Sequence, residues 1–78
     1  PDGELVLVVD DEVALRDGAA RALAAAGFTV RVAPGGTEAL ALLDALDGTV
    51  ACLVTDQTMP GMSGDALAHV VAQRWPEV

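Results

Sequence analysis

Hydrophobic residues along the chain fall into short continuous runs, and two of these runs are followed by acidic residues. The first run, Leu5–Val9, is followed directly by Asp10 and Asp11, and the second, residues 50–54, is followed after one threonine by Asp56. Continuous runs of leucine and β-branched residues are typical of strands that are buried on both faces of a parallel sheet. The pattern therefore predicts two buried strands whose carboxyl ends carry acids.

A third strand is predicted between these two runs, over residues 28–32, where apolar and polar residues alternate. Alternation is typical of a strand with one exposed face, so we expect this strand to lie nearer an edge of the sheet. Three other segments repeat apolar residues at intervals of three and four, which predicts helices over about residues 11–26, 37–47 and 63–75. Leu15 is expected on the buried face of the first helix.

Local capping signals indicate where the helices begin. Asp11 or Glu12 is suited to open the first helix, Thr37 the second, and Ser63 or Gly64 the third. Strands and helices then alternate along the chain with short turns between them, and right-handed crossovers place helices on both faces of a parallel sheet. The predicted fold is a doubly wound α/β sheet in one domain.

The charge balance excludes one large class of function. The 78 residues carry a net charge of −8, with four arginines and no lysine, whereas nucleic acid is bound by clustered basic residues. No apolar run reaches the roughly 18 residues of a membrane span, and the first residues lack the basic region of a signal peptide, so we expect a cytoplasmic protein. Cys52 is expected to be a small buried residue, His69 a surface or packing residue, and Trp75 an anchor of the third helix.

The acids at the ends of the two buried strands form the candidate functional site. Ligands of open α/β sheets bind beyond the carboxyl ends of the strands, so we expect Asp10, Asp11 and Asp56 to converge. Close carboxylates repel one another, and a hard cation such as Mg²⁺ relieves that repulsion. An aspartate beside Mg²⁺ is suited to accept a phosphoryl group. On the residues alone the acids could instead be caps of the following helices, and Asp11 is well placed for that role.

At this point the motifs resemble the receiver domains of two-component response regulators. Residues 8–12, with the sequence VVDDE, look like the family's first-strand signature, and residues 56–64, with the sequence DQTMPGMSG, are similar to its phosphorylation loop. Leu15, Arg16, Leu23, Gly27 and Phe28 keep the spacing of its first helix, and Gly36, Glu38, Ala39 and Leu40 resemble the start of its second. The resemblance extends over nearly the whole chain.

The resemblance implies a role for each residue that matches the motif. Asp56 would be the phosphoacceptor, loaded from the phosphohistidine of a sensor histidine kinase or a phosphotransfer domain. Asp10 and Asp11 would be the acidic pair that holds Mg²⁺ together with Asp56, and Thr58 would supply a backbone carbonyl to the metal. The protein would be a signalling domain that catalyses only its own phosphorylation and dephosphorylation, with the flavodoxin-like strand order 2-1-3-4-5, of which 2-1-3 is expected here.

The resemblance also implies that residues 1–78 are a single but incomplete receiver domain. Family members continue through two more strand-helix units, which supply a Ser or Thr and a Lys that hold the phosphoryl oxygens. With three strands, the last strand becomes an edge. On this ground, and in contrast to the burial that its apolar run favours for Cys52, we expect Val50, Cys52 and Val54 to meet water or another chain and the first strand to be partly uncovered. The chain is therefore expected to form a homo-oligomer or to belong to a longer protein.

Two other classes of function are open at this stage. A phosphatase of the haloacid dehalogenase type also places a nucleophilic Asp after a buried strand, but its motif resembles Asp-x-Asp, and residues 56–58 lack the second acid. A truncated receiver could also act only as a protein-interaction module, using its unpaired strand edge and its apolar faces.

Overall fold

Strands and helices alternate along the chain, as the hydrophobic pattern predicts. The computed structural model describes residues 3–57 and 61–78. Its elements are β1 (Leu5–Val9), α1 (Val13–Ala25), β2 (Thr29–Ala33), α2 (Gly36–Ala45), β3 (Cys52–Thr55) and α3 (Gly64–Arg74). In the described part of the chain, no helix has the length and the apolar character needed to cross a membrane.

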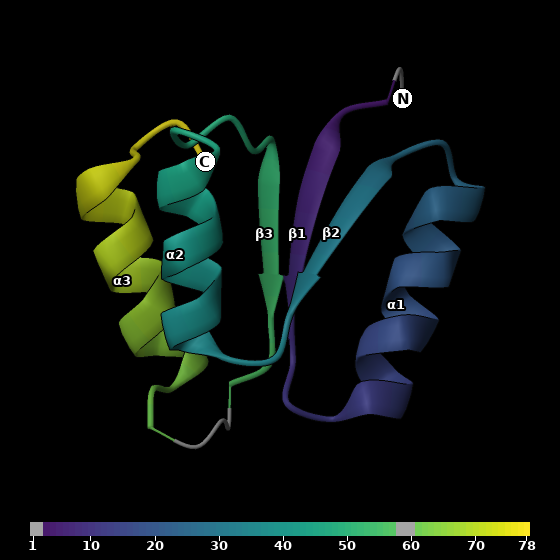
Figure 1. The fold of residues 1–78 in the computed structure, drawn as a ribbon, viewed down its shortest axis with the longest axis horizontal. Coiled ribbons are helices and arrows are strands. Elements are labelled where there is room, and N and C mark those ends of the chain that lie inside the picture. Colours follow the sequence, from purple (N-terminus) through teal and green to yellow (C-terminus); the bar gives the residue numbers. More distant parts are fainter. Residues whose placement is uncertain (1–2, 58–60) are drawn as a thin grey trace.

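The three strands form one parallel sheet with β1 in the centre, in the order β2-β1-β3. Helix α1 lies on one face of the sheet, and α2 and α3 lie on the other (Figure 1). This arrangement confirms the doubly wound α/β fold, the order 2-1-3 and the edge position of the second strand. The carboxyl ends of all three strands point to the same edge, at the bottom of Figure 1, where the loops lead into the helices.

The main hydrophobic core lies between the sheet and the pair α2 and α3. Leu7 and Val9 of β1 face this core, whereas Val6 and Val8 face the side of α1, because successive side chains of a strand alternate between faces. The core cluster consists of buried aliphatic residues from the sheet, from α2 and α3, and from the segment that leads into β3: Leu7, Val9, Ala33, Ala39, Leu43, Val50, Leu67 and Val71. Trp75, at the end of α3, packs against this cluster and so has the anchoring role predicted for it.

Helix α1 is much less buried than the pattern predicts. None of its residues is buried, and the expected core residue Leu15 is 62% exposed. The helix packs on β1 and β2, so Leu15 lies outside the strip of α1 that contacts the sheet. That strip is enough to bury Val6 and Val8 to 2% exposure, and the expectation that β1 would be partly uncovered on this side is wrong.

The predicted helix starts are partly wrong and partly confirmed. Helix α1 begins where predicted, with Glu12 as its N-cap, although no side chain caps it. Helix α2 begins at Gly36, so Thr37 lies inside the helix and the start predicted there is wrong. Helix α3 begins as predicted, because the hydroxyl of Ser63 accepts a hydrogen bond from the N–H of Ala66 at 3.1 Å.

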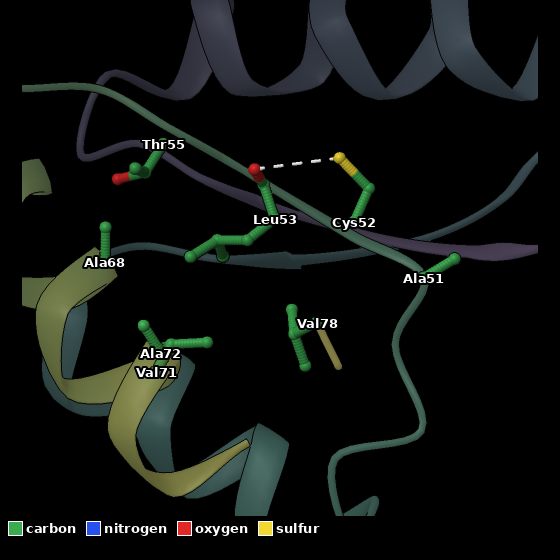
Figure 2. Close-up of a pocket in the computed structure, with 8 residues that line it drawn as sticks. All are labelled: Ala51, Cys52, Leu53, Thr55, Ala68, Val71, Ala72 and Val78. Carbon is green, nitrogen blue, oxygen red and sulfur yellow. Dashed lines mark hydrogen bonds between the residues drawn. The ribbon is translucent and has the colours of Figure 1, made fainter. Parts of the chain in front are cut away.

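The edge formed by β3 is open on one side. Cys52 and Val54 are exposed, because they share the face of Val6 and Val8 but lie beyond the strip that α1 covers. The expectation of a buried Cys52 is therefore wrong, and the exposure expected from the open strand edge is confirmed for Cys52 and Val54. That expectation is wrong for Val50, which is 5% exposed and belongs to the core. Figure 2 shows a shallow groove along this edge, with Leu53 directed towards α3 and Cys52 to the opposite side. Its lining is mostly apolar: Ala51, Cys52, Leu53, Thr55, Ala68, Val71, Ala72 and Val78.

Candidate metal centre

Three carboxylates meet at the carboxyl end of the sheet. One oxygen atom from each of Asp10, Asp11 and Asp56 lies within 4.8 Å of the others. Asp10 and Asp11 follow β1, Asp56 follows β3, and these two strands are parallel neighbours. The predicted convergence of the three acids is thus confirmed. Asp10 and Asp56 are partly buried and Asp11 is exposed, so the cluster opens to solvent on the side of Asp11.

The backbone of the central strand fixes where two of these acids lie. The N–H of Asp56 donates to the carbonyl oxygen of Val9 at 3.1 Å, and the N–H of Asp10 donates to that of Ala33 at 3.2 Å. Each bond continues the ladder of the sheet one step past the end of a strand. Because groups positioned by strands are held more precisely than groups on loops, these bonds hold both α-carbons in a fixed relation.

Asp10 is also held by the start of α1. Its carboxylate Oδ1 accepts a hydrogen bond from the N–H of Glu12 at 2.9 Å, and its backbone carbonyl accepts one from Nη1 of Arg16 at 3.3 Å. The first bond leaves the second carboxylate oxygen of Asp10 available to a ligand. Sequence analysis did not identify Arg16 as a neighbour of the site, although a lone arginine in the first turns of an alanine-rich helix was a usable signal.

The donor set fits a hard divalent cation. Carboxylates this close repel one another, and oxygen ligands of this kind are what Mg²⁺ and Ca²⁺ prefer. Thr58, the other predicted metal ligand, lies outside the described residues. His69 does not belong to the acidic group: it is exposed on α3, with Nε2 3.2 Å from Nε2 of Gln73.

Comparisons with known proteins agree with this site. The family model described as response regulator receiver domain matches residues 6–78. The chain is 41% identical over 73 residues to the sensor kinase CckA of Brucella abortus (strain 2308), and the aligned residues cover 94% of this chain and 8% of CckA. It is 43% identical over 72 residues to the DNA-binding transcriptional regulator NtrC of Salmonella typhimurium, and the aligned residues cover 92% of this chain and 15% of NtrC. The chain therefore spans a small part of these relatives.

Solved structures show the same fold. The receiver domain of the hybrid histidine kinase CckA superposes with a TM-score of 0.79 at 37% identity, covering 94% of this chain and 64% of that chain. The response regulator TrrA of Thermotoga maritima, in complex with Mg²⁺-BeF, superposes with a TM-score of 0.84 at 30% identity, covering 94% of this chain and 62% of that chain.

The family match over residues 6–78 is to receiver domains, so the haloacid dehalogenase alternative is not favoured. A module that serves only for interaction is not favoured either, because three carboxylates converge at the end of the sheet, as a phosphoacceptor site requires. With the fold, the converging acids and the family match in agreement, the chain belongs to the family of response regulator receiver domains, the signalling domains of two-component systems.

Proposed function

We propose that Asp56 is the phosphoacceptor of this receiver domain and that it binds Mg²⁺ together with Asp10 and Asp11. The observation that carries the proposal is the approach of the three carboxylates to within 4.8 Å of one another at the end of the sheet. A structural neighbour described as a complex with Mg²⁺-BeF supports the choice of metal. The backbone carbonyl of Thr58 is proposed as a further ligand on the motif alone.

The chemistry assigned to Asp56 is a phosphoryl transfer. A carboxylate oxygen of Asp56 attacks the phosphorus of a phosphohistidine on a histidine kinase or phosphotransfer domain, the phosphorus–nitrogen bond breaks, and the imidazole leaves with the electron pair. Mg²⁺, when bound, offsets the negative charge of the transferring group. Asp10 and Asp11 contribute the metal-binding charge that Asp56 alone lacks. The domain modifies only itself, so we propose a signalling acceptor rather than an enzyme with a separate substrate.

Phosphorylation of the full-length protein tests this proposal. The protein is incubated with Mg²⁺ and acetyl phosphate, the acyl phosphate is trapped with borohydride, and the modified residue is located by mass spectrometry. We expect the label on Asp56, and its loss in Asp56→Asn but not in Asp17→Asn, a matched change at an exposed acid of α1. Label on Asp10 or Asp11 with Asp56 unmodified would contradict the assignment.

We further propose that residues 1–78 act as one domain whose β3 edge is covered by another strand. The exposed Val54 and the apolar groove beside β3 support this, because an unpaired apolar edge is costly to leave in water. The covering strand would come from a second copy of the chain or from the rest of a longer protein, and the relatives above carry this sequence within longer chains. A cytoplasmic location is proposed on family membership alone.

A further inference from the structure

We propose that Gln57 is a positioning residue for Asp56, because its side chain ties the segment that carries the acceptor to the first turn of α3. The inference rests on the proposed function, since it presumes that Asp56 is the acceptor. Gln57 directly follows Asp56 and is exposed, and its side-chain oxygen is engaged by the N–H of Asp65 in α3. Its role is therefore to act through its neighbour rather than on the metal or the phosphoryl group.

Gln57 makes two hydrogen bonds to the start of α3. Its backbone carbonyl accepts the N–H of Gly64 at 3.0 Å, and its side-chain Oε1 accepts the N–H of Asp65 at 2.8 Å. The first N–H groups of a helix have no partner within the helix, so an acceptor aimed at them is well placed. One residue thus joins the end of β3 to the start of α3 through both its backbone and its side chain.

The start of α3 lies against the same segment. Gly64 is buried, and a Cβ added there would collide with the backbone carbonyl oxygen of Asp56 and would lie 2.8 Å from Oε1 of Gln57. The absence of a side chain at Gly64 therefore permits this close approach. The Gln57 bonds hold the two segments together at the resulting distance.

These contacts complete the restraint of Asp56 on both sides. On the side of β3, its N–H is bonded to Val9 of the central strand. On the other side, the following peptide is held by Gln57. A reacting carboxylate must be held within a fraction of an ångström of its productive geometry, so loosening one side should slow the transfer more than it weakens metal binding.

Ser63 provides a matched control within the same helix. Its hydroxyl accepts the N–H of Ala66 and so also caps α3, but no hydrogen bond joins its side chain to Asp56 or Gln57 among the described residues. Gln57→Met keeps the length of the side chain and removes the acceptor, Gln57→Glu keeps an acceptor, and Ser63→Ala removes the other cap. A purely helix-stabilising role predicts that Gln57→Met and Ser63→Ala behave alike.

The test measures the rate of Asp56 phosphorylation by acetyl phosphate in the full-length protein, at saturating Mg²⁺ and saturating donor. A carboxylate oxygen of Asp56 attacks the phosphorus, and the bond from phosphorus to the acetate oxygen breaks to release acetate. We expect Gln57→Met to lower the maximal rate about three- to tenfold, the size of one lost positioning hydrogen bond. The maximal rates of Ser63→Ala and Gln57→Glu should stay within about twofold of the wild-type rate. Each of these variants keeps a side-chain oxygen at position 57 that can accept the N–H of Asp65.

Wild-type rates in Gln57→Met, or equal losses in Gln57→Met and Ser63→Ala, would overturn the inference while leaving Asp56 as the acceptor. An equal loss in Gln57→Glu would also overturn it, because the retained acceptor would then have no effect. A wild-type protein that takes no phosphoryl group on Asp56 would instead overturn the proposed function itself. Thermal unfolding of each variant shows whether the two caps contribute equally to stability, which separates loss of fold from loss of positioning.

Discussion

The backbone N–H of Glu12 donates a hydrogen bond to the carboxylate Oδ1 of Asp10 at 2.9 Å. Because the donor is a backbone group, the bond does not depend on the side chain at position 12. The carboxylate of Glu12 does not belong to the acidic cluster, whereas that of Asp11 does. Two adjacent acids in the sequence therefore have different relations to the proposed metal.

This difference predicts unequal effects on Mg²⁺ affinity. Asp11→Asn should weaken binding at least about tenfold, because even residues that only orient a metal ligand are worth that much. Glu12→Gln should weaken it less than about threefold, since an exposed charge that does not touch the metal is screened by solvent and salt. Isothermal calorimetry with the full-length protein checks both. Equal losses would mean that the acids act as a diffuse field rather than as ligands.

The fold and the centre of the site are predictable from the sequence because they depend on neighbouring residues. The run Leu5–Val9 has the length and the β-branched composition of a buried strand, and Asp10 then lies at its carboxyl end. Alternation with helices predicts parallel strands, and the strand order implied by the resemblance places β1 beside β3, which brings Asp56 to the same edge.

The remaining details depend on which surfaces are covered, and no local pattern contains that information. Leu15 has the spacing of a buried residue, but α1 contacts β1 and β2 along a strip that excludes it. Cys52 sits in an apolar run, yet it lies on the part of β3 that α1 does not reach. The hydrogen bond from the N–H of Asp65 to Gln57 joins two residues eight positions apart in the sequence, which no periodicity indicates.

Two glycines with opposite environments give a test of stability. Gly48 has a φ of +70°, and a Cβ there would collide with the indole ring of Trp75. Gly48→Ala should therefore lower the free energy of unfolding by about 1–3 kcal/mol, from left-handed strain plus displacement of the ring. Gly18 lies inside α1 with open space around it, so Gly18→Ala should raise that free energy by about 0.5–1 kcal/mol.

Chemical denaturation of both variants, followed by circular dichroism, measures the two changes. The opposite signs are the essential point, since both substitutions add the same methyl group. A stabilising Gly48→Ala would mean that Trp75 does not occupy the end of α2 in solution. A destabilising Gly18→Ala would mean that α1 is packed against something at that position.

The last prediction concerns the open edge of β3. Val54 is 40% exposed there, on the same face of the sheet as Val8. Exposed apolar edges template pairing with further strands, and a charged side chain on the edge prevents it. We therefore expect residues 1–78, prepared alone, to associate as their concentration rises, and Val54→Lys to reduce that association.

Val32 is 42% exposed on the other outer strand, β2, next to α1 in Figure 1, so Val32→Lys is the matched control and should have little effect. Light scattering across a concentration series measures the mass of each form. A monomer that unfolds cooperatively at every concentration would show that the three-stranded core is sufficient by itself, and that the β3 edge needs no covering strand.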